Sequence, residues 1–246
     1  MRSRRQLAAC CCALLCAVTW LPAVAASPGA AEVRFAPGAS ATEVKGQLKG
    51  RDDADHRLVG SAGQTMRVEL VTHNPSINFN VWAPGARDAM FIGGADNTAT
   101  LLLPDDGAYR LQVFLVRSAA RRGERGSYTL KVSISGQALP PLPARLDAQL
   151  PGSRFHAQAT VRCRPPYAAG LSDCEAGVVR RGRDGTATVQ FTGPNKLPRS
   201  VLFVGGKAVA SDSSEPIKAS RQGDLTTVTI GESETYPVPD ALLTGG

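Results

Sequence analysis

The sequence predicts an all-β protein, with an antiparallel sandwich or barrel in its first half and a second small, mostly β domain after it. Short segments rich in β-branched and aromatic residues alternate with turn residues between positions 40 and 136, and no apolar period of 3.6 residues is sustained. A proline-rich segment then separates them from further strand-like segments. Two domains of this size can each bury a core unaided.

Eight strands are expected in the first domain. Apolar residues alternate with polar ones most clearly at Met66, Val68 and Leu70 and again over 128–134, as in a sheet with one buried and one wet face. Segment 109–116 is partly apolar on both faces, which indicates a central strand. The expected strands are 43–48, 54–59, 65–72, 77–83, 89–92, 98–103, 108–116 and 126–134.

The domain boundary is expected where three prolines fall in four positions, Pro140-Pro141-Leu142-Pro143, because proline donates no ladder hydrogen bond. We expect a first domain over 32–136, a linker over 137–150 and a second domain over 151–246. In the second domain Val204-Gly205-Gly206-Lys207 is typical of a hairpin turn. The strands expected there are 154–162, 177–181, 186–191, 201–204, 207–210 and 225–230.

The first 26 residues have the order of a secretory signal peptide. A basic start precedes an apolar stretch from Leu7 to Leu21, and small residues at 23–26 end it. About 15 apolar residues are short for a permanent span, which needs roughly 20. Leu7-Ala8-Ala9-Cys10 imitates a lipoprotein box but lies too early, at the very start of the apolar stretch. We therefore expect a periplasmic or secreted protein without a stable membrane span.

Composition excludes several classes of protein. With 43% hydrophobic and 20% charged residues, the chain is expected to fold rather than to stay disordered. Three arginines of the leader contribute to the formal charge of +7, so residues 27–246 carry +4. Because this excess is small and evenly spread, we expect no nucleic-acid partner.

Cys163 and Cys174 are the only cysteines after the leader. An even pair in an oxidising compartment predicts a disulfide. A zinc site would need a further ligand, and His156 is the only nearby candidate. We therefore expect no metal.

The chain lacks the usual signatures of catalysis and cofactor binding. It has no Gly-x-Ser-x-Gly, phosphate loop, His-Glu-x-x-His or dinucleotide fingerprint, so we expect no enzyme and no cofactor. Carboxylates cluster at Asp52-Asp53-x-Asp55 and at Asp105-Asp106, where turn formation is the first interpretation and acid/base work or calcium the alternative. An unrecognised activity would have to use the region of His156, Asp173 and Glu175.

Arginines crowd the connection between two expected strands, at Arg117, Arg121, Arg122 and Arg125. They form either a solvated hairpin end or a guanidinium cluster that binds carboxylates through bidentate hydrogen bonds. Arg180-Arg181-Gly182-Arg183 is interpreted as a solvated turn, with contact to an anionic partner as the alternative.

These residues carry a resemblance to a known family. The run Leu103-Pro104-x-x-Gly107-x-Tyr109-x-x-x-Val113-x-Leu115-x-Arg117-x-x-Ala120-Arg121-Arg122-x-Glu124-x-x-Ser127-Tyr128-x-Leu130 resembles the bacterial periplasmic inhibitors of invertebrate-type and goose-type lysozymes. Three upstream runs fit the same pattern: Leu48-Lys49-Gly50-Arg51-Asp52, Ala62-Gly63-Gln64-Thr65-Met66 and Asn78-Phe79-Asn80-Val81-x-x-Pro84-Gly85. The likeness covers about residues 32–136. A looser likeness links this region to β-sandwich domains appended to secreted peptidases, and the C-terminal region resembles uncharacterised exported bacterial proteins.

The resemblance implies an eight-stranded antiparallel β-sandwich whose loops enter a lysozyme cleft. The family's Ser-Gly-x-Tyr loop corresponds to Asp106-Gly107-Ala108-Tyr109, with aspartate in place of serine. Arg117 and Arg121 match the arginines that the resemblance leads us to expect in contact with a goose-type enzyme. The implied partner-binding residues are Asp106, Gly107, Tyr109, Arg117, Arg121 and Arg122.

Two functions follow as hypotheses. The first is a noncatalytic inhibitor of a goose-type or invertebrate-type lysozyme that inserts both loops into the cleft. The alternative is an envelope module that uses the same arginines to bind anionic cell-wall material or another exported protein, without inhibition.

Overall fold

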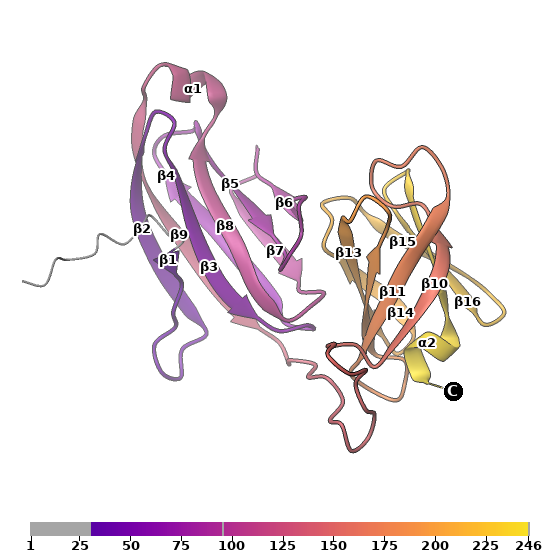
Figure 1. The fold of residues 1–246 in the computed structure, drawn as a ribbon. Coiled ribbons are helices and arrows are strands. Elements are labelled where there is room, and N and C mark those ends of the chain that lie inside the picture. Colours follow the sequence, from indigo (N-terminus) through magenta and orange to yellow (C-terminus); the bar gives the residue numbers. More distant parts are fainter. Residues whose placement is uncertain (1–30, 95, 246) are drawn as a thin grey trace, which may run out of the picture.

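The computed structural model describes residues 31–94 and 96–245, so the expected signal peptide lies outside the described residues. The described chain forms two groups of β-sheets joined by a segment without helix or strand between residues 136 and 156 (Figure 1). Each group has its own cluster of buried side chains, one from residues 33–134 and one from 161–243. The expected two-domain, all-β fold is confirmed, whereas the exact bounds of the domains stay a prediction.

The first domain is a sandwich of two sheets (Figure 1), ordered β1-β3-β8-β5-β6 and β2-β9-β4-β7. Its strands are β1 (Ala31–Glu32), β2 (Ala41–Lys49), β3 (Asp53–Gly60), β4 (Thr65–Thr72), β5 (Ile77–Trp82), β6 (Phe91–Ile92), β7 (Thr98–Leu102), β8 (Gly107–Leu115) and β9 (Arg125–Ser135). All eight expected strands are present. The strand β1 was not expected, and it pairs with β3 in parallel.

The predicted alternation accounts for the sandwich core. Along β8, Tyr109, Leu111, Val113 and Leu115 point inward and are buried, while the residues between them are partly exposed. The strand lies between β3 and β5, so it is central, as its two partly apolar faces indicated. Leu130 and Val132 of β9 are buried in the same core.

The second domain combines a five-stranded sheet, β10-β11-β12-β13-β14, with a three-stranded sheet, β15-β16-β17. Its elements are β10 (Ala157–Cys163), β11 (Ser172–Arg180), β12 (Ala187–Thr192), β13 (Pro198–Val204), β14 (Lys207–Ser211), β15 (Ile217–Gln222), β16 (Leu225–Ile230), β17 (Glu234–Pro239) and the short helix α2 (Asp240–Thr244). Arg164, which follows β10, and Thr235 of β17 exchange backbone hydrogen bonds of 2.8 and 3.0 Å. These bonds link an edge of the five-stranded sheet to an edge of the three-stranded sheet.

Two local predictions for this domain are confirmed. Val204 pairs with Lys207, and Gly205 and Gly206 have φ of 55° and 73°. This is the left-handed pair that a tight two-residue hairpin requires. Cys163 and Cys174 form a disulfide between β10 and β11, with Cα atoms 5.8 Å apart. No helix in the part of the chain that the structure describes is both long and apolar enough to cross a membrane.

Candidate functional site: the arginine end of the sandwich

The arginine-rich connection between β8 and β9 folds into a one-turn helix, α1 (Arg117–Arg121), at one end of the sandwich (Figure 1). Ala119 of this helix is fully buried and anchors the turn to the core. Arg117 and Arg121 are four residues apart, so they lie on the same helical face. Both are exposed, and neither forms an ion pair with any residue of the described ranges.

These two arginines border a shallow groove of about 520 Å³. The turn between β2 and β3 is held beside α1, because the backbone N–H of Gly50 donates to the carbonyl of Glu124 at 2.7 Å. The outward side chains of β8 form the floor. The groove is lined by Arg51, Asp52, Asp53, Gln112, Phe114, Leu115, Arg117, Ala120 and Arg121.

Arg122 differs from the other two arginines because its guanidinium already pairs with an acidic side chain. Its Nε donates to Glu124 Oε1 at 2.9 Å. This hydrogen bond from Arg122 is the main reason that the pKa of the Glu124 carboxyl is lowered. Arg117 and Arg121 therefore remain as the free guanidinium groups of α1.

The structure places Asp106, Gly107 and Tyr109 at the opposite end of β8. Six residue steps separate Tyr109 from Leu115, a distance of about 20 Å in an extended strand. Tyr109 is fully buried, its hydroxyl donates to the carbonyl of Asp105 at 2.7 Å, and burial raises the pKa of that hydroxyl. The two expected insertion elements are therefore not brought together.

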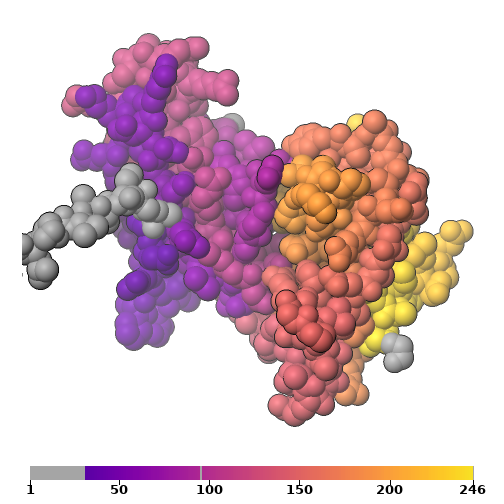
Figure 2. Space-filling view, viewed as in Figure 1, coloured from indigo at the N-terminus to yellow at the C-terminus, as the bar shows by residue number. Residues whose placement is uncertain are grey.

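The second domain covers this opposite end. Arg181, whose side chain is 0% exposed, donates through Nη1 to Asp106 Oδ2 at 2.7 Å and through Nη2 to Asp105 Oδ1 at 3.2 Å. Arg154 also pairs with Asp105, and the hydroxyl of Thr188 donates to the carbonyl of Pro104 at 2.7 Å. The loop contacts the chain's own second domain, and Figure 2 shows the two domains in contact.

Asp106, which the resemblance aligns with a serine, uses both of its carboxylate oxygens as acceptors. Asp106 Oδ1 accepts from the backbone N–H of Ala62 at 3.0 Å, while Oδ2 accepts from Arg181. A serine hydroxyl could not supply both acceptors and a charge. The residue is thus suited to an intramolecular partner rather than to a foreign cleft.

Two interpretations of polar runs need correction. Arg180 and Arg181 do not form a solvated turn, because both are buried and paired with carboxylates, Arg180 with Asp147 at 2.9 Å. Asp105 is likewise more than a turn residue, since it is 3% exposed and binds two arginines. Buried charges of this kind need partners. The fold supplies them from the first domain for Arg181 and from the interdomain segment for Arg180.

The residues considered for an unrecognised activity are not assembled into a site. His156 is buried, its Nδ1 accepts from the backbone N–H of Arg180 at 3.0 Å, and its Nε2 faces the carbonyl of Leu142 at 3.3 Å. Asp173 pairs with Arg162 on the surface, and Glu175 accepts from Gln158. Among the described residues, no cluster of three or more metal-ligating side chains occurs.

Sequence reasoning missed Arg51 as part of the groove. The residue lies in the β2–β3 turn, far from α1 along the chain. In the structure β2 pairs with β9 up to Lys49–Arg125, and this pairing brings the turn beside the arginine connection.

Comparison with solved structures finds similarity to lysozyme inhibitors. PliG of Aeromonas hydrophila, a periplasmic lysozyme inhibitor of g-type lysozyme, is 41% identical, with 43% of this chain and 96% of that chain covered and a TM-score of 0.40. PliG of Salmonella Typhimurium is 23% identical, with 44% and 99% covered and a TM-score of 0.37. The pre-peptidase C-terminal domain of a Bacillus anthracis collagenase is 17% identical, with 43% and 95% covered and a TM-score of 0.35.

The neighbours thus include the goose-type inhibitors that the sequence resembles, over less than half of this chain. No model of a known protein family matches the chain, and no curated protein matches it.

Proposed function

We propose that this chain is an exported, noncatalytic inhibitor of a goose-type lysozyme, and that Arg117 and Arg121 bind acidic residues of the lysozyme cleft. The observation that carries the proposal is the pair of exposed guanidinium groups on one face of α1, without ion-pair partners in the described residues. The PliG structures described as inhibitors of g-type lysozyme support the choice of partner.

The geometry favours binding through one end of the sandwich. Asp106, Gly107 and Tyr109 are left out of the proposed contact because they lie at the other end, against the second domain. Arg122 takes a lesser part, since Glu124 competes for it. The rigid strands β8 and β9 hold α1 on both sides, which lowers the entropy lost on binding.

The test is the lysis of peptidoglycan by goose-type and invertebrate-type lysozymes in the presence of the purified protein. The variant Arg117→Ala/Arg121→Ala is expected to lose inhibitory potency at least tenfold, because each charge-assisted contact contributes about 1.5–3 kcal/mol. Arg34→Ala/Arg67→Ala removes the same charge from exposed positions elsewhere on the sandwich and is expected to keep full potency.

Two results would contradict the proposal. Unchanged potency of the α1 variant would remove the arginines from the mechanism, and a lack of inhibition of both enzyme classes would end the inhibitor assignment. Cosedimentation with peptidoglycan that weakens as salt rises, without inhibition, would instead support an envelope module for anionic wall material.

A further inference from the structure

A cleft of about 640 Å³ lies between the two domains and shares no lining residue with the arginine groove. One wall is formed by Asp88 of the β5–β6 connection and Ile92 of β6. The other wall is made by three connections of the second domain, at Pro166–Tyr167, 213–215 and 230–234. Clefts of this size at domain boundaries are preferred places for binding.

A buried arginine closes the floor of the cleft. Nε and Nη2 of Arg199 donate to the two oxygens of Glu234, each at 2.8 Å, and Nη1 donates to Asp212 Oδ1 at 3.1 Å. Its Nη2 also lies 3.7 Å from Asp88 Oδ2 of the first domain. Because its donors are occupied, this guanidinium is not free to attract an anionic ligand.

The walls carry a clear excess of negative charge. Four carboxylates line the cleft against the single guanidinium of Arg199. Glu215 and Glu232 are exposed, and neither pairs with a cation in the described part of the chain. The lining of the cleft therefore has a net negative charge, whereas the chain as a whole carries +7.

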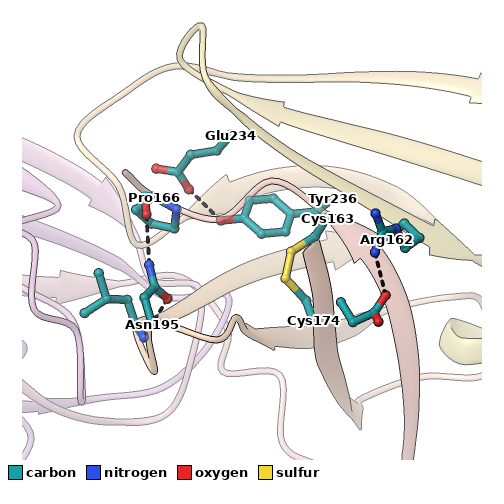
Figure 3. Close-up of a disulfide and its surroundings, with 9 residues drawn as sticks. Arg162, Cys163, Pro166, Cys174, Asn195, Glu234 and Tyr236 are labelled. Carbon is teal, nitrogen blue, oxygen red and sulfur yellow. Dashed lines mark hydrogen bonds and ion pairs between the residues drawn. A yellow bond between two sulfur atoms is a disulfide. The ribbon is translucent and has the colours of Figure 1, made fainter. Parts of the chain in front are cut away.

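Two exposed apolar side chains stand beside these acids. Tyr167 is 82% exposed, yet its hydroxyl donates to Asp88 Oδ1 at 2.9 Å across the domain boundary. The loop that carries it is closed at its base by the disulfide, and Asn195 Nδ2 donates to the carbonyl of Pro166 at 2.9 Å (Figure 3). Ile92 is 64% exposed on the facing wall. Because the ring of Tyr167 is already held in place, it can contact a ligand with little loss of conformational entropy.

We propose that this cleft docks a basic segment of a partner protein. A lysine or arginine would lay its methylene stem on Tyr167 and Ile92 and place its charged head near the carboxylates. The occupant follows from charge complementarity, because the apolar anchors and the acids meet in one cleft whose only cation is already neutralised. The inference stands apart from the role proposed for Arg117 and Arg121.

The test uses two short peptides, acetyl-KLKLK-amide and acetyl-ELELE-amide, titrated into the full protein by isothermal titration calorimetry in 20 mM NaCl. We expect the basic peptide to bind and the acidic one not to bind. Glu215→Gln/Glu232→Gln should weaken binding of the basic peptide at least fivefold, and Tyr167→Ala should do the same through the lost anchor. All three side chains are exposed, so the variants are expected to keep the melting temperature of the parent.

Glu32→Gln/Glu43→Gln is the matched control, because it removes two exposed carboxylates from β1 and β2 without touching the cleft. Absence of binding by the basic peptide, equal binding of both peptides, or an equal loss in the control would overturn the proposal. Self-association of the protein that the Glu215→Gln/Glu232→Gln variant abolishes would also overturn it, because the occupant would then be a second copy of this chain.

Discussion

Replacing Arg181 by methionine is expected to destabilise the sandwich, although Arg181 belongs to the second domain. Its guanidinium donates to Asp105 and Asp106, to the carbonyl of Leu139 at 2.6 Å and to the hydroxyl of Thr188 at 2.9 Å. Methionine fills a similar space without any donor. The two acids would then face the second domain without this cation.

The size of the expected destabilisation depends on which partners Asp105 and Asp106 retain in the variant. Removing one partner of a buried ion pair costs about 3–5 kcal/mol, because the other charge stays buried. Asp105 retains Arg154, and the side chain of Asp106 is 37% exposed and can be hydrated again. We therefore expect the lower end of the range, about 3 kcal/mol.

Urea unfolding followed by tryptophan fluorescence measures this effect. Trp82 in β5 is the only tryptophan after residue 26, so the signal comes from the sandwich while the substitution lies in the other domain. Arg183→Met, at an exposed neighbouring position, is the control and should leave the transition unchanged. Adding Asp105→Asn to Arg181→Met should restore part of the stability, because it removes a buried charge. A loss below about 1 kcal/mol at Trp82 would refute the argument that the domains are energetically coupled.

Three further predictions concern stability. Gly46→Ala should cost about 1–3 kcal/mol in urea unfolding, because the new Cβ would lie 2.3 Å from the hydroxyl of Tyr128. Replacing both Cys163 and Cys174 by alanine should lower the free energy of unfolding by about 2–4 kcal/mol, seen as a lower melting temperature. Burial lowers the pKa of His56 from its ordinary 6.5, so the unfolded chain takes up the proton more readily. Stability should therefore fall as the pH drops below 6.5, and His56→Gln should flatten that slope.

The sandwich strands could be predicted because their signal is local. Alternating residues such as Leu111 and Val113 mark a buried face within a single strand. The strands β15 and β17 were not expected, for different reasons. β15 is exposed along almost its whole length, and β17 contains Pro237 and Pro239, which cannot donate to a ladder and suit the end of a sheet.

Only the α1 end of the candidate site could be predicted, because only there is the sequence signal local. Arg117 and Arg121 lie within one connection, so their spacing alone indicates a shared surface. Asp105-Asp106 and Arg180-Arg181 are each polar runs of the kind found in turns, and no local pattern relates them. Their pairing arises only when the second domain packs on the sandwich, which a single sequence does not encode in any period or motif.

The network around Arg181 also determines how the two proposed surfaces could act together. It binds the second domain to the end of the sandwich that carries Asp106, Gly107 and Tyr109, so the α1 end and the interdomain cleft remain open to a partner. These surfaces have opposite sign, and the Asp88–Tyr167 hydrogen bond belongs to the cleft itself. A partner that contacts both must therefore present acids to α1 and a basic segment to the cleft. Binding at one surface would raise the effective concentration at the other only while the domains stay joined.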